Sequence, residues 1–279
     1  MDEEPYSFVT WRGLQLAKAI QAKFLFFSWQ NILRNYPPPF SLMEKQVLKE
    51  SDYAIVGNRD SAEIWRKKGY TGPIKLIPQF GVSPETFAPA PPQNNGTFVM
   101  GTAGRITEGK GIDLLFHAAS KLSNSDGNWR IRIAGNGDAK DSLNELAQEL
   151  RITDNVEWLG SIGSAEMPTF LQSIDTLVLP SRSTRTWKEQ FGRILVEAMA
   201  CERAVVGSDS GEIPNVIGDA GLIFQEDDAI ALHKQLQTLQ QSPKLRREFG
   251  ERGRQRVMDN YTQTQIADQI VAVYREMCQ

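Results

Sequence analysis

Residues 97–119 read TFVMGTAGRITEGKGIDLLFHAA and join three kinds of sequence in a fixed order. An apolar run (97–103) comes first, a glycine-rich segment with two cations (104–111) follows, and a pattern with helical spacing (112–119) ends the stretch. A run that is apolar throughout suits a strand buried on both faces of a sheet. Because parallel α/β sheets bind phosphate where a strand turns into a helix, the stretch predicts a phosphate-binding turn.

The same alternation of apolar runs and helical patterns continues to about residue 255. Apolar or β-branched runs recur along this part of the chain, at 97–104, 129–135, 155–160, 175–181, 203–208 and 220–224. Helical patterns lie between them, at 111–122, 138–150, 164–173, 191–201 and 228–240. Strands that alternate with helices indicate a doubly wound parallel sheet. We therefore predict an α/β fold with one complete Rossmann-like domain over residues 93–258.

The first 92 residues show the same alternating pattern but are too few for a second complete domain. They predict helices and strands in alternation, with helices at 6–22, 40–50 and 60–68 and strands at 23–29, 53–58 and 74–79. So few strands leave apolar sheet edges open, so we expect a partial domain over residues 1–92 and the lowest stability there. Residues 259–279 predict a final helix over 264–277, and packing against the N-terminal part is one place for it.

Composition narrows the class of protein. The chain has 279 residues, 41% of them hydrophobic and 23% charged, which is typical of a globular protein. A net charge of −3 gives no general affinity for nucleic acid. Cys201 and Cys278 lack metal-binding spacing and are expected to be free thiols. Asp2 to Glu4 stand where a secretory signal would be basic, so the expected compartment is the cytoplasm.

Arg105 and Lys110 lie in the glycine-rich segment. Gly104 to Lys110 match the first seven positions of a P-loop, but Gly111 stands where a P-loop carries the Ser or Thr that holds Mg²⁺. A P-loop NTPase is therefore disfavoured. Two cations on a flexible loop can neutralise a diphosphate without a metal. The alternative is a glycine-rich turn with two solvated charges.

Two further segments carry polar groups at expected strand ends. AGNGDAKDS (134–142) contains G-x-G but has Lys140 in place of the third glycine of a dinucleotide fingerprint, so a plain tight turn is equally consistent. KEQFGRILVEAMA (188–200) places Glu189 before a helix and Glu197 within it. The amides near Gly192 then form an anion site at a helix N-terminus. The alternative is a dipole-favoured Glu189 and a solvated Glu197.

Together these segments resemble the nucleotide-binding half of family 4 glycosyltransferases, which have the GT-B fold and retain anomeric configuration. The resemblance is carried by five segments in fixed order, namely GRITEGKG (104–111), AGNG (134–137), DTLVLPS (175–181), EQFGRILVEAMA (189–200) and GEIP (211–214). It covers about 97–260 strongly and extends weakly into EEPYS and YAIVGN of residues 1–90. It implies that the first part of the acceptor domain lies outside this chain.

The resemblance implies a role for each matched residue. Arg105 and Lys110 match the pair that stabilises the diphosphate leaving group, and Glu189 matches the carboxylate that contacts donor-sugar hydroxyls. These three residues are the implied catalytic groups. The implied donor-binding residues are Glu197 at the ribose, Phe191 and Gly192 beside the sugar and phosphates, Gly104 and Gly135 in the glycine-rich turns, and Trp158 at the base edge.

The resemblance also implies a hexosyltransferase-type enzyme whose donor is a nucleotide-diphosphate sugar and which needs no metal or other cofactor. In agreement, the sequence contains no D-x-D metal clamp. The acceptor is left open as a saccharide, a lipid or a small molecule, with no nucleic acid, and contact with the inner membrane face is left open too. His117 and His233 match no position of the family.

Two other readings remain. One is a non-catalytic nucleotide-sugar binding module that lacks a complete acceptor half. The other is a nucleotide-dependent epimerase or oxidoreductase, which the imperfect fingerprint at Gly135 disfavours.

Overall fold

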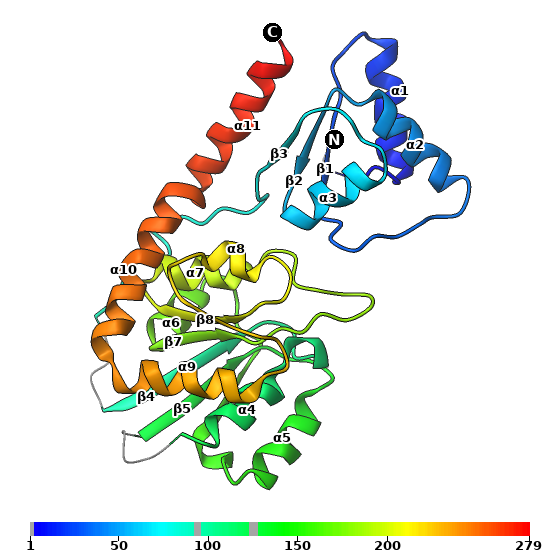
Figure 1. Cartoon of the computed structure of the whole chain (residues 1–279). Coiled ribbons are helices and arrows are strands. Elements are labelled where there is room, and N and C mark those ends of the chain that lie inside the picture. Colours follow the sequence, from blue (N-terminus) through cyan, green and yellow to red (C-terminus); the bar gives the residue numbers. More distant parts are fainter. Residues whose placement is uncertain (1–2, 92–95, 123–127) are drawn as a thin grey trace. The chain divides into compact units, whose positions relative to one another are not determined.

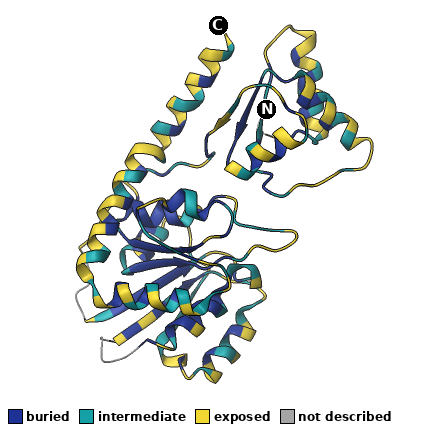
Figure 2. Cartoon of the chain, viewed as in Figure 1, coloured by how far each residue is buried: buried dark blue, intermediate teal, exposed yellow. Residues whose placement is uncertain are grey.

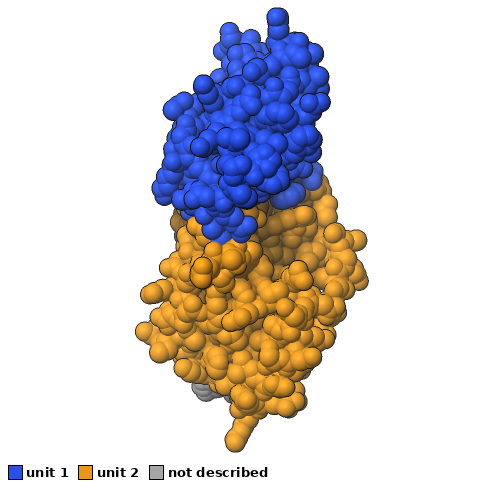
Figure 3. All heavy atoms as spheres, turned by 90° about the vertical axis from the view of Figure 1, so that its right-hand side faces the viewer, with its two compact units in different colours: residues 1–81, 263–279 blue, residues 82–262 orange. Residues whose placement is uncertain are grey.

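A computed structural model describes residues 3–91, 96–122 and 128–279 of the chain (Figure 1). Two compact units divide it: residues 1–81 with 263–279, and residues 82–262 (Figure 3). The final helix therefore belongs to the same unit as the N-terminal residues. The domain boundary predicted between residues 92 and 93 lies outside the described residues.

The larger unit is built on one parallel sheet of six strands in the order β6-β5-β4-β7-β8-β9. The strands are β4 (Thr97–Ala103), β5 (Asn128–Ala134), β6 (Val156–Gly160), β7 (Thr176–Leu179), β8 (Ala204–Ser208) and β9 (Leu222–Phe224). From β4 the chain adds β5 and β6 on one side. It then crosses back to add β7, β8 and β9 on the other side of β4. The order therefore reverses between β4 and β7, which is the topological switch point where doubly wound sheets bind ligands. All six strands predicted for this part are present.

Helices cover both faces of this sheet, which explains its uniformly apolar strands (Figure 2). The helices are α4 (Ile112–Ala119), α5 (Lys140–Glu149), α6 (Met167–Gln172), α7 (Arg193–Ala200), α8 (Ile213–Ile217), α9 (Ala229–Gln241) and α10 (Pro243–Asn260). α4 packs against α5 and α9 over the side of β4 that carries Phe98 and Met100. α7 packs against α6, α8 and α10. The predicted α/β fold with a doubly wound parallel sheet is confirmed.

α10 is a helix that sequence patterning did not predict. Its 18 residues include five arginines and no continuous apolar stripe. Two glycines supply the close contact instead, because a Cβ on Gly250 would lie 2.3 Å from Glu202 O and one on Gly253 would lie 2.9 Å from Met199 Cγ. Arg254 donates to Ala200 O at the end of α7, and Arg256 donates to Val216 O in α8. α10 is thus held by backbone approach and by arginines that satisfy helix-end carbonyls.

The smaller unit contains a parallel sheet of three strands, in the order β1-β2-β3. Its elements are β1 (Leu25–Ser28), β2 (Tyr53–Val56), β3 (Ile74–Leu76), α1 (Phe8–Ala19), α2 (Phe40–Glu50), α3 (Arg59–Lys67) and α11 (Gln263–Met277). α1, α2 and α3 bury Phe26 and Val56 on one face with Trp65. Ile266 and Val273 of α11 pack on the other face, where Tyr53 Oη donates to Glu276 Oε2 at 3.1 Å.

A hollow of about 230 Å³ lies under α11, lined by Leu25, Phe27, Ile55, Ile77, Pro78, Gln79, Ile270 and Tyr274. Its lining is mostly apolar, so these side chains make fewer packing contacts than they would in a close-packed core. The strands of this sheet are also short, at three to four residues each. Both features lower the free energy needed to open the smaller unit.

We therefore expect amide protons of β1, β2 and β3 to exchange faster than those of β4, β7 and β8, by about tenfold or more. Native-state hydrogen exchange followed by mass spectrometry on the monomeric chain measures both sheets in one experiment. Equal protection of the two sheets would contradict the expectation.

Candidate functional site

Two glycine-rich turns meet at the carboxyl ends of β4 and β5. Gly104 follows β4 with φ +137°, and Gly135 follows β5 with φ +146°. A Cβ on Gly135 would lie 1.9 Å from Gly104 O, so only glycine allows the two turns to touch. Gly104 N also donates to Ala134 O at 2.9 Å. The predicted site residues Gly104 and Gly135 are therefore neighbours in space, and the reason is backbone proximity.

Gly111 brings the turn after β4 against the end of β7. A 3₁₀ turn, Glu108–Lys110, leads into Gly111, which precedes α4 with φ +65°. A Cβ on Gly111 would lie 2.0 Å from Pro180 O. The position that would carry a hydroxyl in a P-loop is thus filled by backbone contact with the next loop of the site. This contact is a structural reason for the absence of Ser or Thr there.

Lys110 and Glu189 form an ion pair across the switch point. Lys110 Nζ lies 2.7 Å from Glu189 Oε2, and the two side chains are 23% and 12% exposed. The same carboxylate oxygen accepts from Ser181 Oγ at 3.1 Å. The Lys110 ammonium also lies 4.9 Å from the centre of the Trp187 ring, a cation–π contact. The structure thus brings together two predicted residues that are 79 positions apart in the chain.

Arg105 lies near this pair but is more exposed and is not paired with a carboxylate in the described part of the chain. Arg105 and Lys110 both line a small cavity of about 10 Å³ at the ends of β4 and β5, room for a single water at most. The Arg105 side chain is exposed. Within the described part of the chain, no hydrogen bond or ion pair engages its guanidinium. The site therefore offers one cation ready for an anionic ligand and one already neutralised.

The main chain at Glu189 is fixed from the far side by the turn before α8. Glu189 O accepts from Glu212 N at 3.1 Å. A Cβ on Gly211 would lie 2.0 Å from the same carbonyl. The GEIP segment thus serves the site through backbone contact with the loop that carries Glu189.

α7 presents the remaining predicted residues. Gly192 precedes the helix with φ +77°, and in the first turn of α7 Leu195 N donates to Gly192 O at 2.8 Å. Phe191 is buried, and its ring centre lies 5.8 Å from that of Tyr261. Glu197 is buried inside the helix, where Arg193 Nε lies 2.7 Å from its Oε1. Burial raises the pKa of the Glu197 carboxyl, and the Arg193 charge partly opposes the rise.

Trp158 lies in the edge strand β6 and packs beside helices. Its ring meets that of Phe116 edge-on at 6.4 Å, and Lys140 Nζ lies 5.5 Å from its centre. Two residues later, Gly160 O accepts from Gly135 N at 2.7 Å. Trp158 is therefore near the Gly135 turn but is held under α4 and α5, and its contact with a base stays a prediction.

Sequence reasoning did not single out Ser181, Arg182 or Trp187. Ser181 and Arg182 follow the apolar run of β7, so a strand-end rule would have found them. Trp187 carried a signal too, as a large aromatic in an otherwise polar loop. The two histidines lie elsewhere: His117 is exposed on α4, and His233 Nδ1 lies 3.1 Å from Ala118 O.

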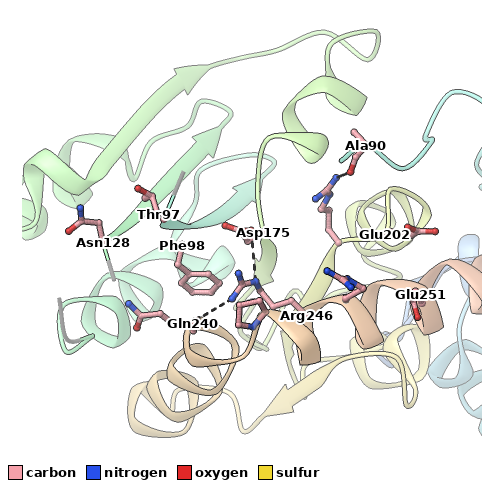
Figure 4. Close-up of a pocket in the computed structure, with 13 residues that line it drawn as sticks. Ala90, Thr97, Phe98, Asn128, Asp175, Glu202, Gln240, Arg246 and Glu251 are labelled. Carbon is pink, nitrogen blue, oxygen red and sulfur yellow. Dashed lines mark hydrogen bonds and ion pairs between the residues drawn. The ribbon is translucent and has the colours of Figure 1, made fainter. Parts of the chain in front are cut away.

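A separate cavity of about 430 Å³ lies at the amino ends of the strands (Figure 4). Its lining includes Asp175 before β7 and Arg246 of α10, whose Nε lies 3.8 Å from Asp175 Oδ1. The Arg246 guanidinium also lies 5.3 Å from the Phe98 ring centre. Burial lowers the pKa of Arg246. None of the predicted site residues lines this cavity, so the candidate site is confined to the carboxyl edge.

The described residues contain neither a metal-binding group nor a membrane-spanning helix. Over residues 3–91, 96–122 and 128–279, no three His, Cys, Asp or Glu side chains are grouped so that they could hold a metal ion. In the same ranges, no helix combines the length and the apolar character needed to cross a membrane.

The family model for glycosyl transferases group 1 matches residues 84–256, more than half of the chain. The chain belongs to this family. The matched range contains the whole six-stranded sheet and every residue of the candidate site. The family assignment made from the sequence motifs, family 4 with the GT-B fold, is confirmed.

Two relatives illustrate the range of this glycosyltransferase family. The D-inositol 3-phosphate glycosyltransferase of Stackebrandtia nassauensis is 31% identical over 69% of this chain and 47% of its own length. The phosphatidyl-myo-inositol mannosyltransferase of Mycolicibacterium smegmatis is 32% identical over 82% of this chain and 59% of its own length. The chain thus spans about half the length of the curated relatives it matches.

A solved structure supports the fold. Anabaena HepE in complex with UDP superposes with a TM-score of 0.80 at 17% identity, over 96% of this chain and 76% of that one. At that identity the likeness concerns the fold alone, and it confirms the predicted GT-B architecture.

Gly111 and Gly160 provide a matched pair that tests the contact at Pro180. Both have left-handed φ, +65° and +68°, but a Cβ on Gly160 would meet nothing within 4 Å. We expect Gly160→Ala to cost about 1–2 kcal/mol of unfolding free energy from backbone strain alone. Gly111→Ala should cost a further ~1–3 kcal/mol from steric overlap. Urea denaturation of both variants measures the difference, and equal costs would contradict the close approach.

The buried Glu197 predicts a pH-dependent stability. Because its pKa is raised in the folded protein, the folded state holds this proton to higher pH than the unfolded state does. Its contribution to stability is therefore greatest below the unfolded value of about 4.3 and is lost as pH rises through the folded pKa. We expect wild type to lose stability relative to Glu197→Gln as the pH rises from about 4 through the raised pKa of the folded protein. Parallel urea denaturation curves at several pH values measure this, and a difference that stays constant or has the opposite sign would refute it.

Proposed function

We propose that this chain carries the donor site of a retaining glycosyltransferase, which moves a sugar from a nucleotide-diphosphate sugar to an acceptor. One observation carries the proposal: Arg105, Lys110 and Glu189 gather at the topological switch point, beside the N-terminus of α7. Cations, a carboxylate and the positive end of a helix dipole suit a diphosphate linked to a polyhydroxyl group.

The cations act on the leaving group. When the bond between the anomeric carbon and the diphosphate breaks, negative charge collects on the departing phosphate. Arg105 stabilises that charge from its exposed position at the end of β4. Lys110 does so by exchanging its contact with Glu189 for one with phosphate, or by sharing it. Amides at the start of α7 add fixed dipoles, which cost no reorganisation.

The two carboxylates bind hydroxyls. Glu189 is held at a defined place by Ser181 and Lys110, and its carboxylate accepts from hydroxyls of the donor sugar. Glu197 accepts from the ribose hydroxyls, with Arg193 favouring its ionised form. Phe191 and Gly192 place the α7 turn against the sugar and phosphates. Gly104, Gly135 and Trp158 line the path toward the nucleotide.

Donor binding is proposed to need no metal. Arg105 and Lys110 supply two positive charges at the place where a magnesium ion would bridge phosphate oxygens in a metal-dependent enzyme. Donor affinity should therefore be the same in EDTA as in millimolar Mg²⁺.

The acceptor is proposed to be a saccharide, a lipid or a small molecule. The two relatives described above are named for different acceptors, an inositol phosphate and a phosphatidylinositol. α1 exposes Phe8 and Leu16 by 54% and 63%, and its C-cap residue Ile20 is 67% exposed. These apolar side chains support peripheral contact with a membrane, and so a place in the cytoplasm or at the inner membrane face.

A second function is a nucleotide-sugar binding module without turnover. It is favoured by the small sheet of three strands in the smaller unit, because the acceptor side of a two-domain transferase needs a formed surface. Binding of a donor without its hydrolysis or transfer would support this alternative.

The test combines calorimetry with a turnover assay on UDP-, GDP- and ADP-sugars. We expect one donor to bind, and Arg105→Ala and Glu189→Ala to weaken it by tenfold or more, the equivalent of a charge-assisted hydrogen bond of about 1.5–3 kcal/mol. Arg130→Ala is the matched control, because Arg130 is an exposed arginine of β5 within the strand and away from the turns. No binding of any donor would contradict both functions, and unchanged binding in both variants would contradict the site.

A further inference from the structure

Arg182 is a largely buried cation directly after the strand that ends at the site. Its side chain is 18% exposed. It donates to both oxygens of Asp113, from Nη1 at 2.7 Å and from Nη2 at 2.6 Å. Its Nε donates to Asp227 Oδ1 at 2.5 Å. One guanidinium therefore joins the first turn of α4 to the segment between β9 and α9.

Arg182 also holds the turn that carries Lys110. Its main-chain N–H donates to Gly109 O at 2.8 Å, and its Nη1 donates to Glu108 O at 3.3 Å. Asp113, its bidentate partner, lies three residues after Lys110 on the same segment. Contacts on both sides of Lys110 thus converge on Arg182.

The other side of Arg182 leads to Glu189. Ser181, the preceding residue, donates to the Glu189 carboxylate, and its carbonyl accepts from Ser208 Oγ at 2.5 Å. Ser183, the next residue, donates from its N–H to Glu226 Oε2 at 2.6 Å. Arg182 therefore contacts the Lys110 turn, and its neighbour Ser181 contacts the Glu189 carboxylate.

The Lys110 turn needs such a tie because its backbone is intrinsically loose. Glu108–Lys110 is a single 3₁₀ turn, with Gly109 inside it and Gly111 after it. Glycines lose more conformational freedom on ordering than any other residue, and short 3₁₀ turns have weak hydrogen bonds of their own. The hydrogen bonds to Asp113 and Asp227 hold the pKa of Arg182 above its ordinary value, so its charge is permanent.

We infer that Arg182 is a positioning residue, which sets the Lys110 ammonium at the place where the diphosphate of the donor binds. This inference rests on the proposed function. Arg182 acts through Lys110 and touches no donor atom itself. A group fixed before the ligand arrives loses little freedom on binding, so its removal should weaken the contact with the diphosphate while contacts with the nucleoside remain.

Arg182→Met tests the inference, with Arg132→Met as its matched control. Arg132 makes an equivalent bidentate pair with Glu157, at 2.8 and 3.0 Å, and its partners, Glu157 and Ser173, are not residues of the candidate site. Calorimetry with UDP, GDP and ADP identifies the nucleotide that wild type prefers, and the matching monophosphate is then measured. We expect Arg182→Met to weaken the diphosphate by about tenfold and the monophosphate by less than about twofold, as for loss of one charge-assisted contact. Arg132→Met should leave both values within about twofold, because its hydrogen bonds go to Glu157 and Ser173 and not to the Lys110 turn.

A double-mutant cycle separates positioning from general support of the fold. In a Lys110→Met background the diphosphate affinity should already be low, and adding Arg182→Met should reduce it no further. Arg182→Lys, which keeps the charge but not the fork, should show an intermediate loss of diphosphate selectivity. If Arg182→Met does not fold, Asp113→Asn carries the test on the same contact, with the same expected loss.

The outcomes distinguish the inference from the function beneath it. If wild type prefers the diphosphate and Arg182→Met keeps that preference, the positioning role is overturned while the donor site stands. Equal weakening of diphosphate and monophosphate, or additive losses with Lys110→Met, would also overturn it. If wild type binds no diphosphate at all, the proposed function itself fails.

Discussion

The close approach of two loops at the switch point is the constraint on which the rest of the site depends. β4 and β7 are neighbours in the sheet although 72 residues of chain separate the end of β4 from the start of β7. Gly111 lets the first loop contact the Pro180 carbonyl, and this contact places Lys110 within reach of Glu189. If the gap were wider by one side chain, cation and carboxylate would face solvent separately. The ion pair between Lys110 and Glu189 thus depends on a glycine, which has no Cβ, at position 111.

Much of the larger domain could be predicted from sequence, because buried parallel strands are apolar throughout and the connecting helices repeat their apolar residues every three to four positions. The predicted strands β4 to β9 and the helices α4, α5, α6, α7 and α9 are all present, with ends that differ by a few residues. α10 escaped prediction because its packing uses Gly250 and Gly253 as contact points and arginines as caps. A hydropathy pattern shows neither close packing at a glycine nor a hydrogen bond from an arginine to a backbone carbonyl.

The site was partly accessible from sequence for a related reason. Motif order predicted Arg105, Lys110, Glu189 and Glu197 as members of one site, through the resemblance to a family pattern. The pattern does not record that Lys110 and Glu189 contact each other, or that Arg105 is exposed while Lys110 is paired. Those states follow from strand order and from loops that meet only after folding. Arg182 escaped notice because its partners, Asp113 and Asp227, lie on two other connections of the sheet.

The packing of α10 has a practical consequence for making the larger unit by itself. The helix closes the carbonyl ends of α7 and α8 with Arg254 and Arg256, and Val82 N donates to Tyr261 O just beyond its end. An expression boundary placed after α9, where the alternation of strands and helices stops, would uncover those carbonyls together with Met199. A fragment that keeps residues 82–262 retains every one of these contacts. The useful limit of the domain is therefore marked by arginine-to-carbonyl hydrogen bonds, some twenty residues beyond its last strand–helix unit.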